Sequence, residues 1–172
     1  MKFSAWMAAA LGAFACAGAA SAQQPGIGCT AQQSPGRPQV LRCGGGLTIV
    51  AEDGATFTLL DRDRNGQVDG VDLRSKAVFV EAPKKKTGQQ FEVITPQAIA
   101  AVRGTKWAVD AEGGKTSVFV DSGRVGVRRP SAPGRVVLGP GEGVDVDDSA
   151  TPLEVKRWPA PRVAALMARL GR

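Results

Sequence analysis

The chain has 172 residues, with 22 basic and 16 acidic side chains, and it contains no histidine. It therefore lacks the commonest general base and metal ligand, and neither a P-loop nor a G-x-S-x-G motif is present, so we expect no enzyme activity. Paired carboxylates could still act on glycosidic bonds, but the acidic residues lie mainly in predicted turns. The net charge of +6 favours acidic partners, although an aromatic content of 5% without tyrosine argues against nucleic acid.

The first 22 residues have the pattern of a secretory signal peptide. Lys2 precedes a short apolar run, and the small residues A-S-A at 20–22 form a cleavage site, with cleavage expected after Ala22. Loss of Lys2 lowers the net charge from +6 to +5. A lipid anchor on Cys16 is not expected, because Ala13 stands where such a signal has a leucine-like residue. No later apolar run approaches the roughly 20 residues that span a bilayer, so we expect a periplasmic protein without a transmembrane segment in its mature chain.

Residues 23–45 are expected to form an N-terminal arm, since they are rich in proline, glycine and glutamine and show no periodic apolar pattern. Cys29 and Cys43 are the two cysteines that follow the signal peptide, and an oxidising compartment favours a disulfide between them. A redox or metal-binding pair would call for C-x-x-C spacing or histidine. The disulfide would close a loop of about 15 residues, which the chain-entropy model values at about 3 kcal/mol, and would pin the arm.

Residues 46–147 consist of short apolar segments separated by turn signals, such as "GLTIVA", "ATFTLL", "AVFVEA" and "TSVFV". Near the end of this region, Val144 and Val146 face one side of a predicted strand while Asp145 and Asp147 face the other. About ten short strands at this spacing predict an all-β domain. The pattern leaves a sandwich, a barrel and a solenoid-like wrap open.

One turn in this series, "DRDRNGQVDGVD" at residues 61–72, matches the spacing of a calcium-binding loop. Six residues stand at the ligand positions 1, 3, 5, 7, 9 and 12 of such a loop: Asp61, Asp63, Asn65, Gln67 (through its backbone carbonyl), Asp69 and Asp72. Gly66 holds the sharp-turn position, and Arg62 and Arg64 are expected to point outward. The alternative is a solvated β connection, since the flanking segments look like strands and not like the helices of an EF-hand. Ca²⁺ is thus the one cofactor that the sequence suggests.

The stretch "AIAAVRGTKWAVD" places Arg103, Gly104 and Thr105 between two apolar strand segments. Gly104 permits a bulge or reversal that a Cβ would hinder, and Trp107 and Val109 are expected to share a face. No acid or nucleophile is adjacent to Arg103. We therefore expect a buried guanidinium that donates hydrogen bonds to loop carbonyls, and not a charge aimed at a ligand.

Residues 148–172 are expected to be a linker followed by one short α-helix that covers the sheet. Four apolar residues recur at the i, i+3, i+4 and i+7 spacing of one helix face: Val163, Leu166, Met167 and Leu170. Pro161 suits the first turn of such a helix, and Gly171 suits its end. A helix that docks onto a partner is the alternative function for this stripe.

Three segments together resemble the FecR domain: "TPQAIAAVRGTKWAVD", "TSVFVDSGRVGV" and "LGPGEGVDV". The family pattern runs T-P, a small residue, V-R-G-T, an aromatic residue and V, followed by T-x-V-x-V, G-x-V-x-V and L-x-x-G. Its first part is carried by Thr95, Pro96, Ala98, Val102, Arg103, Gly104, Thr105, Trp107 and Val109. Its later parts are carried by Thr116, Val118, Val120, Gly123, Val125, Val127, Leu138 and Gly141. The sharp resemblance covers residues 93–147.

The resemblance implies an all-β extracytoplasmic module that works through protein contact and has no catalytic residues. Typical members of the family are membrane-spanning regulators that relay a signal from an outer-membrane receptor to a cytoplasmic sigma factor. This sequence shows neither their cytoplasmic N-terminal domain nor their transmembrane helix, so we expect it to correspond to the periplasmic part of such a relay. Its expected partner is an inner-membrane sensor or an envelope receptor protein. The alternative is a calcium- or glycan-binding envelope protein that uses the loop 61–72.

Overall fold

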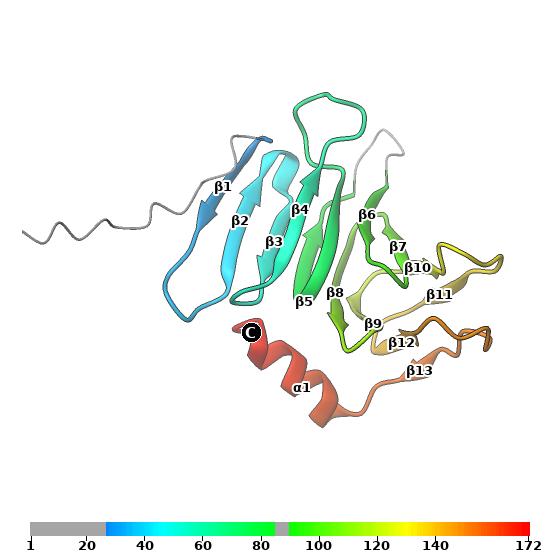
Figure 1. The fold of residues 1–172 in the computed structure, drawn as a ribbon. Helices are drawn as coiled ribbons and strands as arrows, with labels where there is room; N and C mark the ends of the chain where they lie inside the picture. Colours follow the sequence, from blue (N-terminus) through cyan, green and yellow to red (C-terminus); the bar gives the residue numbers. More distant parts are fainter. Residues whose placement is uncertain (1–26, 85–89) are drawn as a thin grey trace, which may run out of the picture.

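The computed structural model describes residues 27–84 and 90–172. They form one curled sheet of thirteen strands and one α-helix, which lies against the outer face of the sheet (Figure 1). The predicted all-β fold with a short C-terminal helix is confirmed. The predicted signal peptide, residues 1–22 with its cleavage site after Ala22, lies outside the described residues.

The strands follow one another closely along the chain. They are β1 (Cys29–Gln32), β2 (Gln39–Cys43), β3 (Thr48–Ala51), β4 (Thr56–Leu60), β5 (Gly70–Ala82), β6 (Phe91–Ile94), β7 (Ile99–Val102), β8 (Thr105–Glu112), β9 (Lys115–Ser122), β10 (Val125–Arg128), β11 (Val136–Leu138), β12 (Glu142–Val146) and β13 (Lys156–Arg157). The helix α1 spans Ala160–Arg169. The ten strands predicted from the sequence correspond to β3 through β12, and the additional three come from the N-terminal arm and from the segment before α1.

The strand β5 joins the two halves of the sheet. Its first part pairs with β4 and β6, and its second part, from Lys76 onward, pairs with β3 and β8. The change of partners falls at Lys76, which has a φ of +64°, a backbone conformation that is uncommon for a residue with a side chain. One half of the sheet therefore runs β1-β2-β3-β5-β8-β9-β12-β13, the other runs β4-β5-β6-β7-β10-β11, and the sheet curls where they meet (Figure 1).

The inner face of the curled sheet encloses the main hydrophobic core. Val78 and Val80 on β5 lie opposite Val109 and Trp107 on β8, and all four side chains are buried. Trp107 and Val109 thus share a face, as predicted. Most of this core consists of valine, whose branched side chain packs well on a pleated surface.

The outer face carries a second, smaller core beneath α1. Leu166 and Leu170 are buried there, and Val163 and Met167 are partly buried. They pack on a group of sheet residues and one aromatic residue before the helix: Val50, Ala77, Phe79, Ala108, Phe119 and Trp158. The predicted apolar stripe is confirmed as the face that covers the sheet. Gly171 lies just past the C-cap Leu170, and its φ of +67° suits a residue without a Cβ at the end of a helix.

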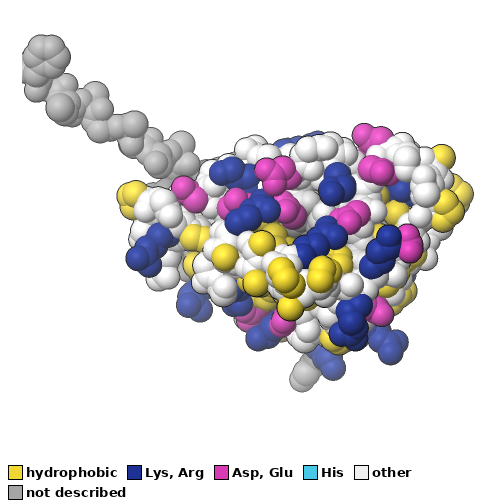
Figure 2. Space-filling model, turned by 90° about the horizontal axis from the view of Figure 1, so that it is seen from below, with side chains coloured by type: hydrophobic (Ala, Val, Ile, Leu, Met, Phe, Trp, Pro, Cys, Tyr) yellow, Lys and Arg dark blue, Asp and Glu magenta, His cyan; other side chains and the backbone are white. Residues whose placement is uncertain are grey.

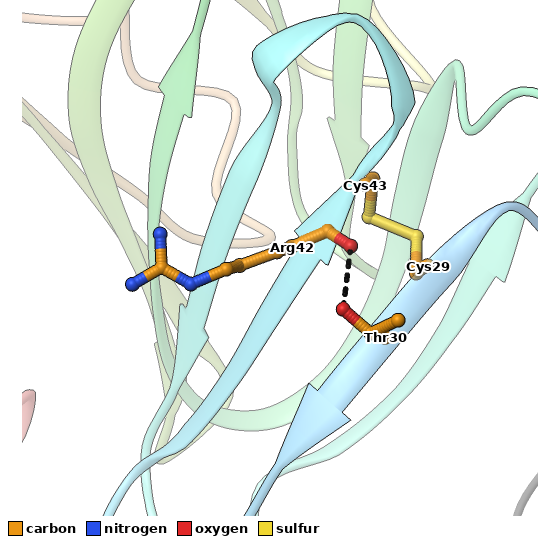
Figure 3. Close-up of a disulfide and its surroundings, with 4 residues drawn as sticks. All are labelled: Cys29, Thr30, Arg42 and Cys43. Atoms are coloured by element: carbon orange, nitrogen blue, oxygen red, sulfur yellow. Dashed lines mark hydrogen bonds between the residues drawn. A yellow bond between two sulfur atoms is a disulfide. The ribbon is translucent and has the colours of Figure 1, made fainter.

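The N-terminal arm is extended and belongs to the edge of the sheet. Its strand β1 pairs with β2 so that Cys29 lies directly opposite Cys43, and the predicted disulfide between them is present (Figure 3). The hydroxyl of Thr30 donates to the carbonyl of Arg42 at 3.4 Å. The disulfide therefore holds the outermost strand of this half in register.

Candidate functional site

The turn between β6 and β7 contains the T-P element of the sequence motif. The buried Thr95 hydroxyl accepts a hydrogen bond from the backbone N–H of Ala98 at 2.9 Å and lies 2.7 Å from the hydroxyl of Thr116. Thr116 also donates to the side chain of Gln97 at 3.2 Å. Because these polar groups satisfy one another, this part of the motif stabilises the turn.

The V-R-G-T element brings two turns into close contact. Gly104 and Gly123 have φ values of +71° and +91°, and a Cβ on Gly123 would lie 2.9 Å from the Gly104 carbonyl oxygen. The hydroxyl of Thr105 donates to the carbonyl of Arg124 at 3.1 Å, which ties the turn before β8 to the turn before β10. Trp107 follows in the core. These residues have architectural roles.

Arg103 is exposed, so the expectation of a buried guanidinium is wrong. It occupies the short turn between β7 and β8, and its neighbours Val102 and Thr105 are the buried residues of the motif. The hydroxyl of Thr105, two residues later and beside Gly123, donates to the carbonyl of Arg124 in the adjoining turn.

The loop 61–72 brings together three of the six predicted calcium ligands. Carboxylate oxygens of Asp61, Asp63 and Asp69 lie within 4.8 Å of one another. Asp61 accepts hydrogen bonds from the backbone N–H groups of Asn65 and Gly66 at 3.0 and 2.9 Å, so the sharp turn forms as the spacing predicts. Calcium binding by this loop stays a prediction.

Two of the other predicted ligands, Asn65 and Asp72, have hydrogen-bond partners of their own. The Asn65 side chain donates to Asp63 at 2.8 Å and accepts from the backbone N–H of Gln67 at 2.8 Å. Asp72 lies on β5, where one of its oxygens accepts from Arg74 at 2.6 Å and the other is buried without a hydrogen-bond partner among the described residues. Position 12 of the loop is therefore separate from the cluster, because Asp72 is already part of the sheet.

Arg62 turns inward, which corrects the expectation that it points away from the loop. Its guanidinium donates to Asp69 at 3.0 Å and to Glu92 at 2.5 Å, and its backbone N–H donates to Asp69 at 2.8 Å. Burial opposes the charge of Arg62, but hydrogen bonds to Glu92 and Asp69 outweigh it and raise its pKa. A cation at this cluster would share Asp69 with an arginine.

Acidic side chains form a row across the outer face of the sheet, on one side of α1. Glu52 follows β3, Asp110 lies on β8 and Asp145 on β12, and strand pairing aligns them with Ala77 and Ser117 between them. We call these five residues the acidic row. It runs parallel to the apolar residues that α1 covers, since neighbouring rows on one sheet face are two residues apart along each strand.

Two arginines of α1, seven residues apart, lie on this row. Arg169 donates two hydrogen bonds to Glu52, at 2.7 and 3.1 Å, and two to Asp110, also at 2.7 and 3.1 Å. Arg162 donates to Asp145 at 3.0 Å and to Ser117 at 3.2 Å. Its guanidinium lies 3.6 Å above the centre of the Trp158 ring.

The electrostatics of these contacts hold the helix in place. Burial disfavours the charged form of Asp145, yet hydrogen bonds from Arg162 and Ser117 outweigh this effect and lower its pKa. The hydrogen bonds to Glu52 and Asp110 raise the pKa of Arg169 above its ordinary value. Sequence reasoning identified the apolar stripe of α1 but not these arginines, although their seven-residue spacing places them on one helix face.

A second polar row lies on the other side of α1 and is left uncovered by it. Strand pairing aligns the five residues Arg42, Thr48, Glu81, Lys106 and Ser122 across β2, β3, β5, β8 and β9. We call them the open row. The outer face thus has an apolar strip under the helix, an acidic row bound by the helix and a mixed row beside the helix.

Comparisons with known proteins agree with this architecture. Residues 43–126 match the family model described as FecR protein, a region that contains the V-R-G-T element and ends before Leu138 and Gly141. Two crystal structures of a "putative anti-sigma factor" from Parabacteroides distasonis ATCC 8503, at 2.50 and 1.65 Å resolution, have a similar fold, with TM-scores of 0.62 and 0.61 and identities of 23% and 22%. Each comparison covers 77% of this chain and 61% of the other, so the chain spans less than two thirds of their length.

No curated protein matches the chain. Among residues 27–84 and 90–172, no helix has the length and apolar character needed to cross a membrane.

Proposed function

We propose that the protein is an exported, non-catalytic interaction module of an envelope signalling pathway, because residues 43–126 match the FecR family model. Its partner is an inner-membrane sensor or an envelope receptor protein. The FecR match carries this proposal, and the fold shared with proteins described as "putative anti-sigma factor" supports a regulatory role.

The roles of the motif residues also support function through contact. Thr95, Thr105 and Trp107 are buried and hold turns and core, so the strongest sequence signature of the chain supplies no reactive group. Exposed charged residues of the outer face, among them Arg42 and Lys106, lie beside α1. They give the scaffold a surface that another protein can contact.

Export is tested first. The full chain is expressed in a bacterial host, and the periplasmic fraction is released by osmotic shock. We expect the protein there with Gln23 as its first residue, established by N-terminal sequencing. A variant with Ala20→Lys and Ala22→Lys, which removes the small-residue cleavage site, should keep the longer N-terminus. Wild-type protein found only in the cytoplasm with Met1 retained would contradict export.

The partner is tested by crosslinking in the native host. A photoreactive amino acid placed at Ser122, in the open row, is activated in living cells, and the adduct is identified by mass spectrometry. We expect one membrane sensor or receptor to be captured. The matched control carries the same group at Gly113, in the turn between β8 and β9, and should not capture that protein. Adducts with abundant envelope proteins alone, at both positions, would contradict the proposal.

A further inference from the structure

We propose that a groove at the C-terminal end of α1 binds an extended acidic segment of a protein partner. The groove lies between the end of the helix and strands β2 and β3 and has a volume of about 580 Å³. Arg37, Arg42 and Arg172 contribute its positive charge, and its apolar lining is formed by Pro38, Val40, Val50 and Leu170. We call it the arginine groove. The inference rests on the proposed function, because it names what the module recognises in its partner.

The sheet itself builds the floor of the groove. Val40 and Arg42 are two residues apart on β2, so they lie on the same face. Strand pairing sets Val40 beside Val50 and Arg42 beside Thr48. The Arg42 side chain extends away from the disulfide of its neighbour Cys43 (Figure 3). An apolar pair, Val40 and Val50, therefore lies next to a polar pair, Arg42 and Thr48, in fixed register.

The charge of the groove is not balanced internally. Its one acidic lining residue, Glu81, already accepts a hydrogen bond from Arg172 and lies 3.5 Å from the ammonium group of Lys106. The Arg172 guanidinium also lies 4.2 Å from the centre of the Phe79 ring. Arg37 and Arg42 are exposed, and neither has an ion pair or side-chain hydrogen bond with any of the described residues. Two guanidinium groups are thus available to a ligand.

The guanidinium groups of Arg37 and Arg42, next to apolar side chains, favour a polypeptide ligand that carries carboxylates. A guanidinium presents a planar fork of donors that matches a carboxylate, and it sheds its hydration more readily than an ammonium group. In an extended peptide, side chains two residues apart lie on the same side, so a glutamate or aspartate can reach Arg42 while an apolar side chain two positions away contacts Pro38 and Val40. Such a ligand uses both parts of the lining.

An anionic membrane fits this surface less well. Figure 2, seen from the side on which α1 lies in Figure 1, shows acidic side chains interspersed with the basic ones around a central hydrophobic area. A bilayer would bring anionic headgroups against those acidic groups, whereas a peptide can follow the locally positive groove. The apolar floor also lies in a hollow, which a single chain reaches more easily than a flat surface does.

The test measures binding of a defined probe to the exported protein. A fluorescein-labelled peptide in which glutamate and leucine take turns at every second position, with serine between them, is followed by fluorescence anisotropy as the protein is added. Its matched control peptide carries glutamine in place of glutamate. The groove variant is Arg37→Glu with Arg42→Glu, and the control variant is Arg124→Glu with Arg128→Glu, an equal change of charge on β10 and the turn before it. All three proteins are first compared by thermal unfolding. If the groove variant does not fold, Arg37→Gln with Arg42→Gln replaces it.

We expect the acidic peptide to bind the wild type and the groove variant to lose at least about tenfold in affinity, while the control variant stays within about twofold. Equal loss in both variants would show attraction to the overall charge, and equal binding of the glutamine peptide would show a purely apolar contact. Either result overturns the inference. Anionic phosphatidylglycerol vesicles that bind more tightly than the peptide, and lose binding in the groove variant, would overturn it in favour of a membrane.

The inference and the proposed function can fail separately. If a partner is captured in cells and the groove variant captures it equally well, the groove is not the contact site although the signalling role stands. If the acidic peptide binds as expected but no envelope partner is captured, the groove is real and the proposed pathway is wrong.

Discussion

Arg169, in the last turn of α1, forms two nearly parallel hydrogen bonds with Glu52, a residue 117 positions earlier in the chain. The same guanidinium forms two more with Asp110. The side chains of Glu52 and Asp110 are 16% exposed and that of Arg169 is 32% exposed, so the cluster lies at the edge of the interface beneath the helix. One residue thus connects the C-terminal helix to β8 and to the end of β3.

Replacing Arg169 with methionine should detach this end of α1. The change keeps an unbranched apolar stem but leaves two partly buried carboxylates without their cation. We expect a loss of about 2 kcal/mol in the free energy of unfolding, between the values typical of exposed and of buried ion pairs. Urea unfolding measures it. Arg128→Met, at an exposed residue of β10, is the control and should change stability by less than about 0.5 kcal/mol.

A compensating variant tests whether the unpaired carboxylates cause the loss of stability in Arg169→Met. Glu52→Gln and Asp110→Asn, added to Arg169→Met, remove the unpaired charges. Stability should then recover in part, because neutral amides cost less to bury than carboxylates. If the triple variant is less stable than Arg169→Met alone, the carboxylates are not the source of the loss.

Acid should loosen the other end of the helix. The folded-state pKa of Asp145 is lowered, so its protonation is less favourable in the folded than in the unfolded chain. The resulting stabilisation is fully present above the ordinary aspartate pKa of about 3.9 and is lost as pH falls below it through the lowered value. We expect Asp145→Asn to flatten the dependence of stability on pH below about pH 4, with Asp121→Asn, at an exposed position, as the control. An unchanged slope in Asp145→Asn would contradict this prediction.

Gly123 should tolerate a methyl group far less well than Gly113. Both have positive φ, and alanine in that conformation costs about 1–2 kcal/mol. A Cβ on Gly113 would have no atom within 4 Å, whereas one on Gly123 would lie 2.8 Å from the Thr105 hydroxyl and 2.9 Å from a backbone oxygen. Gly123→Ala should therefore lose about 3 kcal/mol or more, and Gly113→Ala only the conformational cost. Thermal unfolding of the two variants measures the difference, and equal losses would show that the two turns are not closely packed.

The loop 61–72 gives a sharp test of calcium binding. If it binds Ca²⁺, the ion should stabilise the wild type by about 2.7 kcal/mol when its concentration is about 100 times Kd. Asp61→Asn with Asp63→Asn should abolish this gain. Asp72→Asn should preserve it, because Asp72 is paired with Arg74 on β5 and lies outside the cluster. Titration calorimetry with Ca²⁺, performed on the wild type and on both variants, distinguishes these outcomes. If the wild type shows no heat of binding, the loop is a turn without a calcium site.

Much of the fold follows from local sequence patterns. Ten strands were predictable because turn residues separate them, and the stripe through Leu166 and Leu170 identified the helix. The disulfide followed from two cysteines in an expected export context. The FecR motif was recognisable because its glycines and threonines stand at the fixed positions that its turns require. These are all signals carried by residues close together in the chain.

The rest depends on contacts between distant residues. No local pattern connects Arg169 with Glu52, or places Val40 and Arg42 at the end of a helix that comes much later in the chain. The inward position of Arg62 depends on Glu92, thirty residues away. Asp72 left the predicted metal cluster because strand pairing placed it in the sheet, which overrides the spacing of a loop motif.

Because the strand β5 pairs with strands of both halves, we expect the sheet to unfold as a single cooperative unit. The first part of β5 supplies hydrogen bonds to β4 and β6 and its second part to β3 and β8, so complete opening of either half removes bonds from a strand on which the other half depends. Amide protons of Val71 and of Val80 should then exchange with solvent in one slow, global opening and not in two separate steps. A partner that binds one half of the outer face therefore stabilises the other half against unfolding as well, without any change in shape.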